Sequence, residues 1–393
     1  MDWKKEIEDG EVAFSRGRYK NALGILERAR PECESAGDPK ALFKCLWLLG
    51  RTYARLAKFE DSIKVLKSAV EIASGEFGKE SQEWAAANTV LGFDLAATEK
   101  FAEAEELLNQ ALALRLKLIG AESKEVAETT FHLGTLKLRE DKLNEAHPLF
   151  SKSLGIRERV LGKDSAAYAE SLIALGDIYV SQRKLDAAAV MLKQAVSVLE
   201  KFGLDNANFG IALHSRAAQL LAYGNYGAAA KEWERAIPIL EQSLSDDHPC
   251  LIAALTGLAA SHVRAFEPRD AKPLFERALG LAERNPTRNQ ADIFACSMGV
   301  GVCLASEHNY KAAEPYFEKA QKQLTEAERD RSEQRLLHSM TTCYLFQGKF
   351  GKALYLMPDQ MRLGHESNLK RYVAILNLIT DLGERHAWHN EDE

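Results

Sequence analysis

Apolar residues recur along the chain at offsets of three, four and seven, and short polar turns separate the apolar segments. The clearest unit runs from Ser165 to Gly203, with a polar turn at residues 181–184. Its two segments each place apolar or small residues on one helical face, namely Leu172, Leu175, Gly176 and Tyr179, then Leu185, Ala188, Leu192 and Ala195. We therefore predict two antiparallel helices that share a face. One pair cannot bury this face alone, whereas stacked copies can.

The same unit repeats from one end of the sequence to the other, with a nearly constant period of about 42 residues. Each second helix carries a small residue at an equivalent position: Ala22, Ser62, Ala104, Ala146, Ala188, Ala229, Ala271, Ala313 and Ala353. An apolar residue precedes each by three positions, and a bulky apolar residue follows each by four. Twelve positions upstream, the first helices carry Gly10, Gly50, Gly92, Gly134, Gly176, Ala217, Ala259, Gly301 and Thr341. Glycine inside a helix costs about 1 kcal/mol relative to alanine, so its recurrence indicates close helix contact.

This order of Leu-Gly, an apolar residue, Ala, a large apolar residue and Ala resembles the tetratricopeptide repeat, and its period resembles the kinesin light chain type. The resemblance implies an all-α fold, a right-handed α-solenoid or superhelix of stacked antiparallel helix pairs. We expect nine repeats, a C-terminal capping helix or half repeat at 368–385, and a disordered acidic tail at 386–393. The repeats are expected at residues 1–35, 40–76, 80–119, 122–161, 164–203, 206–245, 248–285, 288–326 and 331–367.

The composition limits the classes of protein to which the chain can belong. Hydrophobic residues make up 46% of the chain and charged residues 27%, and no apolar run approaches the roughly 20 residues of a membrane span. The charged start, residues 1–6, lacks the apolar core of a signal peptide, so we expect a cytoplasmic protein. A net charge of −6 with mixed signs argues against nucleic-acid binding. The six cysteines lack the spacing of a zinc site, which favours free, buried thiols.

The sequence contains no motif that indicates catalysis. It lacks GxSxG, HExxH, CxxC and the glycine fingerprint of dinucleotide-binding folds. His386 and His389 are too few ligands for a metal site, which needs a supporting shell as well. We therefore expect a protein that is not an enzyme and has no cofactor and no metal site.

The candidate site is a groove. In tetratricopeptide repeat proteins the first helices line a concave groove, which usually takes a peptide. The resemblance implies that the groove here is partly aromatic and partly cationic, with Lys44, Trp47, Arg51, Arg55, Phe93, Phe131, Arg139, Ile173, His214 and Arg264. A peptide with a bulky apolar anchor flanked by acidic residues would fit it. The alternative is that the aromatic residues pack within the solenoid and the arginines are ordinary surface charges.

Two features known from the family are missing. The first helices lack the Asn-Asn pair of kinesin light chains and the carboxylate clamp of chaperone-binding members, so neither cargo nor chaperone binding follows from the resemblance.

Three hypotheses of function remain. The first is a protein-protein interaction scaffold that binds a peptide or protein segment in its concave groove. The second is a regulatory or inhibitory subunit of an effector enzyme or a multiprotein complex, acting through convex or terminal surfaces. The third is self-assembly, for example a homodimer through terminal helices, for which Tyr372, Ile375 and Leu376 are the candidate interface.

Overall fold

The computed structural model describes residues 2–203, 206–324, 333–349, 351–353 and 355–356, and within these ranges the secondary structure consists of helices and turns without a β-strand. The predicted capping helix, the tail and the terminal interface at Tyr372, Ile375 and Leu376 lie outside the described residues. In chain order, the structure begins with α1 (Trp3–Ser15), α2 (Tyr19–Ser35), α3 (Pro39–Arg55), α4 (Phe59–Glu76), α5 (Gln82–Ala97), α6 (Phe101–Ile119), α7 (Lys124–Arg139), α8 (Leu143–Leu161) and α9 (Ala166–Ser181).

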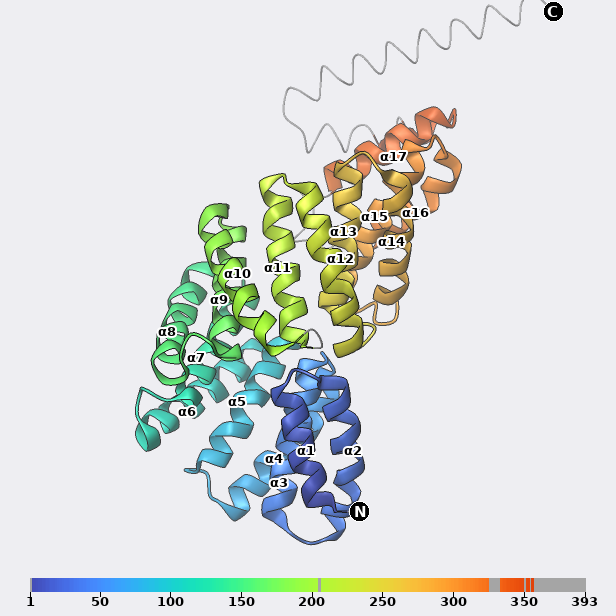
Figure 1. Ribbon diagram of the computed structural model, residues 1–393. Coiled ribbons are helices and arrows are strands. Elements are labelled where there is room, and N and C mark those ends of the chain that lie inside the picture. The colour runs from blue at the N-terminus through green and yellow to red at the C-terminus, as the bar shows by residue number, and fades with distance from the viewer. Residues whose placement is uncertain (1, 204–205, 325–332, 350, 354, 357–393) are drawn as a thin grey trace, which may run out of the picture. The chain divides into compact units, whose positions relative to one another are not determined.

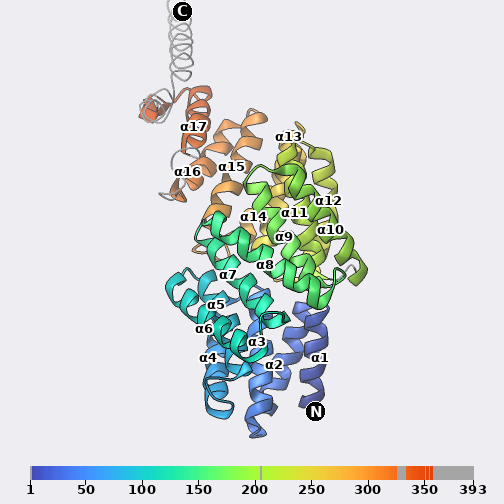
Figure 2. The same cartoon turned by 90° about the vertical axis from the view of Figure 1, so that its left-hand side faces the viewer.

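The remaining helices continue the same alternation of first and second helices. They are α10 (Leu185–Leu199), the 3-10 helix η1 (Glu200–Phe202), α11 (Ala207–Tyr223), α12 (Tyr226–Ser243), α13 (Pro249–Arg264), α14 (Pro268–Ala282), α15 (Gln290–Ser306), α16 (Tyr310–Lys322) and α17 (Gln334–Phe346). The chain divides into two compact units, Met1–Ser261 and a second that begins at His262. Within each unit, helices that follow one another pack together. The prediction of an all-α solenoid of stacked antiparallel helix pairs is confirmed (Figures 1 and 2).

The recurring glycines of the first helices mark close contacts within each pair. A Cβ atom at Gly50 would lie 2.5 Å from the Leu66 side chain, and one at Gly176 would lie 2.6 Å from Leu192. Both leucines are fully buried. The expected reason for glycine at these positions is confirmed, because the bulky residue of the second helix occupies the space that a side chain would need.

The turn inside each pair has one residue in the left-handed conformation. This residue is Ala57, Glu99, Asp141 or Arg183 in four consecutive pairs, with φ between 56° and 63°. The next residue then donates its backbone N–H to a carbonyl five residues back, as Lys58 does to Tyr53 at 2.9 Å. This bond terminates the first helix and directs the chain back along it.

In the first unit the solenoid closes on itself, so that the α1–α2 turn and the start of α2 meet α11 and α12 (Figures 1 and 2). The backbone N–H of Ala207 donates to the carbonyl of Gly17 at 3.3 Å. The Lys20 ammonium donates to the carbonyl of Glu241 at 2.8 Å, and the Ser245 hydroxyl donates to the carbonyl of Leu56 at 3.0 Å. We call this set of contacts the closure.

Gly17 is required for the closure. Its φ is +73°, and a Cβ atom there would lie 2.5 Å from Oδ1 of Asn206, the residue that caps α11. Any other residue would therefore meet both backbone strain and a steric conflict.

Candidate functional site

The closed turn surrounds a pocket of about 640 Å³, lined by residues of α1, α2, α3, α5, α6, α7, α8, α9 and α11. We call it the central pocket. The aromatic side chains Phe14, Tyr19, Phe43 and Trp47 line one part of it. The closure places the ends of α1 and α11 in its wall, so the concave surface of this unit is a partly enclosed site.

Two partly buried glutamates in the central pocket each lie between two arginines, with side-chain exposures of 25% for Glu128 and 14% for Glu170. Glu128 on α7 is 3.1 Å from Arg51 and 3.6 Å from Arg115. Glu170 on α9 stands one repeat later. It is 2.7 Å from Arg55 and 3.5 Å from Arg157. We call each set a triad.

The charges of the triads are fixed near neutral pH. Burial alone would raise the pKa of Glu128, but Arg51 and Arg115 hold that pKa at about 2. Burial likewise acts against Glu170, and Arg55 and Arg157 hold its pKa below the ordinary value. Each triad therefore combines two guanidinium groups with one carboxylate and has a net charge of one positive unit.

The arginines of the second helices are held in place by further hydrogen bonds. Arg115 donates to the carbonyl of Glu125 and the hydroxyl of Thr129, both at 2.7 Å. Arg157 makes the equivalent bonds to the carbonyl of Ala167 at 2.6 Å and the Ser171 hydroxyl at 3.0 Å. Because Arg115 and Arg157 are 1% and 4% exposed, they belong to the solenoid core as much as to the pocket wall.

The arginines of α3 are held differently. Arg51 lies 4.7 Å from the ring centroids of both Phe14 and Trp47, and Arg55 lies 5.9 Å from that of Tyr19. Aromatic faces attract a guanidinium group without using its N–H donors. The α3 arginines therefore keep donors available in the pocket beyond those directed at the glutamates.

Several buried nitrogen atoms of pocket residues have no hydrogen-bond partner among the described residues. They are Nε1 of Trp47, Nε2 of Gln82, Nε of Arg115 and Nδ1 of His132. The first three are donors only. Burial lowers the pKa of His132 to about 4, so this ring is neutral at neutral pH. These donors lack acceptors in the described part of the chain but are shielded from solvent, so carbonyl or carboxylate oxygens of a ligand would reach them only after the covering side chains move.

The pocket has a buried side and an exposed apolar side. Tyr19 and Asn208, which meet at the closure, are 2% and 7% exposed. Ile119 and Leu161 stand at equivalent positions of α6 and α8 and also line the pocket, but they are 40% and 38% exposed. The accessible part of the pocket therefore presents apolar side chains beside charged groups such as Arg55.

Comparison with protein-family models identifies the repeats. A tetratricopeptide repeat model matches residues 84–159, 130–201 and 209–284, and a second such model matches residues 43–75. These segments together cover more than half of the sequence. The chain belongs to the tetratricopeptide repeat family. A comparison of the sequence with curated proteins gave no match.

Solved structures share the fold of this tetratricopeptide repeat protein. One is a Rap protein complexed with competence and sporulation factor, with a TM-score of 0.56, 12% identity, and coverage of 92% of this chain and 97% of that chain. Another is the apo form of RapI, with a TM-score of 0.51, 14% identity, and coverage of 72% of this chain and 97% of that one. At these identities the likeness concerns the fold alone.

Three of the groove residues expected from the sequence come together in the central pocket, namely Trp47, Arg51 and Arg55. Lys44, on the same helix, instead forms an ion pair with Glu11 at 2.7 Å. These positions follow from the single face that α3 directs into the closed turn.

The other candidate residues lie elsewhere in this tetratricopeptide repeat protein. The ring of Phe93 lies 4.9 Å from that of His132, and the ring of Phe131 lies 5.0 Å from that of Phe150. Ile173 is 7% exposed, and His214 accepts a hydrogen bond from Nε1 of Trp233 at 3.0 Å. Two candidates are exposed, Arg139 in the first unit and Arg264 in the second. Their part in binding stays a prediction.

Four charged residues of the triads were not among the predicted site residues, namely Arg115, Arg157, Glu128 and Glu170. The signal was present, because the two arginines occupy one position of consecutive second helices and the two glutamates one position of consecutive first helices. A charged residue that recurs at one position of a repeat suggests a shared structural role. The sequence did not reveal that the arginines of the second helices reach the glutamates of the first helices.

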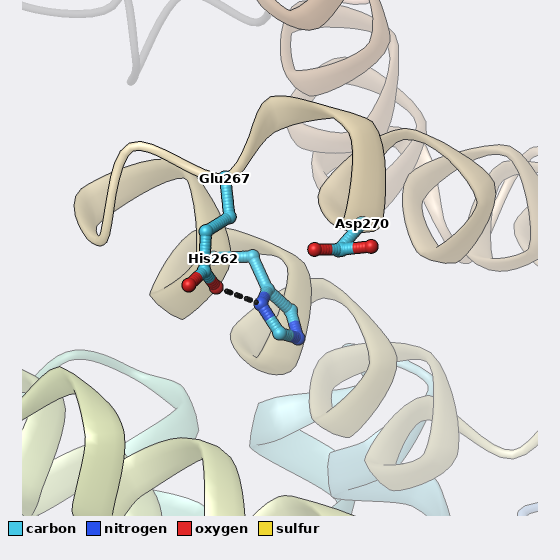
Figure 3. A group of neighbouring side chains, drawn as sticks. All are labelled: His262, Glu267 and Asp270. Atoms are coloured by element: carbon cyan, nitrogen blue, oxygen red, sulfur yellow. Dashed lines mark hydrogen bonds and ion pairs between the residues drawn. The ribbon is translucent and has the colours of Figure 1, made fainter.

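Metal-ligating side chains also gather at one turn of the second unit. Figure 3 shows the ring of His262, the carboxylate of Glu267 and the carboxylate of Asp270 at the α13–α14 turn. Nδ1 of His262 and Oε2 of Glu267 are 2.8 Å apart, and both acidic residues are exposed. This group is the size of a small ion site, but both carboxylates are exposed, and exposed acidic groups commonly gather without a metal ion.

The cysteines are free thiols, as expected from the sequence. All six cysteines are free, and five of them are buried, Cys250 being partly exposed. No described helix is both long and apolar enough to cross a membrane.

Proposed function

We propose that this tetratricopeptide repeat protein is a non-enzymatic interaction scaffold that binds a short peptide or a protein segment in its central pocket. A role in protein interaction is the general one for the family. The central pocket supports the finer statement because it is partly enclosed, has aromatic walls and contains hydrogen-bond donors without partners among the described residues. Peptide carbonyl groups are acceptors, and apolar side chains of a ligand would bury against Phe43, Ile119 and Leu161.

Within the family, we assign the repeats to the longer, kinesin-light-chain-like type. The left-handed turn residues, from Gly17 to Gly348, recur once per helix pair at nearly equal spacing. The Rap protein of the same fold was solved with a bound factor, which supports a ligand-binding role for this fold.

The donors of the central pocket that lack a partner among the described residues are stronger support for ligand binding than the volume of the pocket is. Leaving a buried donor without an acceptor costs roughly 1–3 kcal/mol, and a ligand that satisfies several of them recovers part of that free energy. Trp47 and Gln82 stand on different helices, so one bound chain would connect α3 and α5.

A mixed pentapeptide library, captured on the immobilised protein and identified by mass spectrometry, tests the proposal. Ala86→Phe places a ring in the pocket, since Ala86 lines it, and is expected to abolish capture. Ala102→Phe adds the same ring at an exposed position of α6 and is the control. If Ala86→Phe captured the same peptides as the wild type, the pocket would not be the site, and the convex or terminal surfaces would have to be considered.

A further inference from the structure

The charges of the triads do not cancel, because four arginines face two partly buried glutamates. Glu128 and Glu170 each face two guanidinium groups, at distances between 2.7 and 3.6 Å. Of the other charged residues that line the pocket, Lys124 and Glu125 pair with each other at 3.8 Å, which leaves Glu83. The lining therefore keeps a positive charge, in a site where electrostatic interactions are stronger than in water. An anionic group entering the pocket would be attracted to it.

The two arginines of each triad differ in how firmly they are held. Arg115 and Arg157 each donate to a backbone carbonyl and a hydroxyl, and both are almost fully buried. Within the part of the chain that the structure describes, Arg51 and Arg55 make no equivalent bonds: each has an ion pair with a glutamate and an aromatic neighbour. They are also more accessible, with side-chain exposures of 24% and 35%. A ligand can therefore reach the α3 pair while the other pair stays in place.

We propose that Arg51 and Arg55 bind the carboxylate of an acidic peptide, while Arg115 and Arg157 keep Glu128 and Glu170 compensated. This inference rests on the proposed binding of peptides in the central pocket. A guanidinium group matches a carboxylate geometrically, because two of its N–H donors can face the two oxygen atoms. The glutamates do not become unpaired charges when the ligand binds, because each retains one arginine.

Nearby donors extend the site beyond the two arginines. Nε1 of Trp47 lies on the same helix as Arg51, and Nε2 of Gln82 lies on α5 in the same pocket wall. Neither has a hydrogen-bond partner among the described residues. They are neutral donors shielded from solvent, so the carbonyl groups next to the acidic group of the peptide would reach them only after the covering side chains move. The carboxylate itself belongs either to an Asp or Glu side chain or to the peptide's C-terminus.

The test uses the pentapeptide library in two forms, one with free C-terminal carboxylates and one with C-terminal amides. We expect the wild-type protein to enrich acidic peptides, and to bind them less well as the salt concentration rises. Enrichment of Asp and Glu in the amide library identifies a side-chain carboxylate. Retention only from the free-acid library identifies the C-terminus.

Variants of α3 distinguish carboxylate binding by Arg51 and Arg55 from peptide binding in the central pocket in general. The double variant Arg51→Gln, Arg55→Gln is expected to lose the acidic preference, with affinity for an acidic peptide falling about tenfold or more. Its control, Lys40→Gln with Lys44→Gln, makes the same charge change on α3 outside the pocket. Circular dichroism checks that all variants remain folded. The wild-type enrichment is informative without any variant.

Two outcomes would overturn the inference. Peptides captured by the wild type without Asp or Glu enrichment, and equally from the free-acid and the amide libraries, would leave the scaffold function standing and remove the role of the arginines. The same holds if the arginine variant and the lysine control retain acidic peptides equally. Failure of the wild type to capture any peptide from either library would instead reject peptide binding in the pocket as a whole.

Discussion

The Tyr19 hydroxyl donates a hydrogen bond to Oδ1 of Asn208 at 3.4 Å, which joins side chains 189 residues apart in the sequence. Both are buried, so the bond forms in the interior of the closed turn. Tyr19 begins α2, Asn208 lies in the first turn of α11, and both line the central pocket. The closure and the candidate binding site are therefore built from some of the same residues.

Gly17→Ala is expected to weaken the closure. The variant would need a left-handed residue with a side chain, and its Cβ would conflict with Asn206. Gly37→Ala is a matched control, because Gly37 has φ +67° but no atom within 4 Å of the added Cβ. We expect Gly17→Ala to reduce the free energy of unfolding by about 1–3 kcal/mol more than Gly37→Ala does. Urea denaturation measures the difference, and equal midpoints for the two variants would contradict the closure.

Arg157→Gln is expected to be strongly destabilising. The change removes bonds to the Ala167 carbonyl and the Ser171 hydroxyl, and leaves Glu170 with one arginine instead of two. Loss of one partner from a buried ionic network costs roughly 3 kcal/mol. Arg159→Gln on the same helix breaks only the exposed pair with Glu122 and should change little. Melting curves of the two variants provide the comparison, and similar midpoints would show that the triad adds nothing to stability.

His132 and Glu128 should each lose stabilising free energy as the pH falls, whereas burial raises the pKa of Asp177 to about 7 and opposes them between pH 7 and 4. The pKa of His132 falls from 6.5 to about 4 because the ring is buried, so below pH 6.5 the unfolded chain binds a proton that the folded chain resists. The pKa of Glu128 is lowered from 4.5 to about 2. Its contribution is therefore complete above pH 4.5 and is lost as the pH falls towards 2. Both shifts reduce stability in acid.

His132→Gln tests the contribution of His132. Relative to the wild type, the variant should gain melting temperature as the pH falls from 6.5 to 4, because the proton-binding penalty of the His132 ring is absent; the contributions of His214 and Asp177 are the same in both proteins. The fall below pH 4.5 should persist, since Glu128 is unchanged. Parallel curves for the variant and the wild type across the upper range would contradict the assignment to His132.

Two glycine variants should change stability in opposite directions. Gly50→Ala introduces a Cβ atom 2.5 Å from Leu66 and is expected to cost about 1–3 kcal/mol through overpacking. Gly75 lies in α4 with no atom near an added Cβ, so Gly75→Ala should stabilise the helix by roughly 0.5 kcal/mol. Thermal denaturation should therefore order the proteins as Gly75→Ala, wild type and Gly50→Ala, from most to least stable.

The sequence was sufficient for the fold because its information is local. Each pair is defined by contacts such as Gly176 with Leu192, which are close in the sequence, and the same spacing recurs along the chain. For the same reason Trp47, Arg51 and Arg55 could be placed on a single face of α3. Periodicity determines which side of a helix a residue occupies.

Sequence periodicity could not predict the shape of the site. Periodicity does not give the small rotation between neighbouring pairs, which decides whether the first unit remains an open groove or closes. The contact of Ala207 with Gly17 has no counterpart in the repeat pattern. Arg115 and Arg157 were missed because they belong to second helices, which the family resemblance assigns to the outer layer.

The closure also restricts the copy number of the repeats. An open array tolerates the gain or loss of a unit, because each unit touches only its neighbours. In the first unit, however, Lys20 must reach Glu241, and Ser245 must reach Leu56. Insertion or deletion of one helix pair between these partners would carry them out of register. Duplication, the usual way in which repeat proteins lengthen, is therefore compatible with this fold only outside the interval that the closure spans.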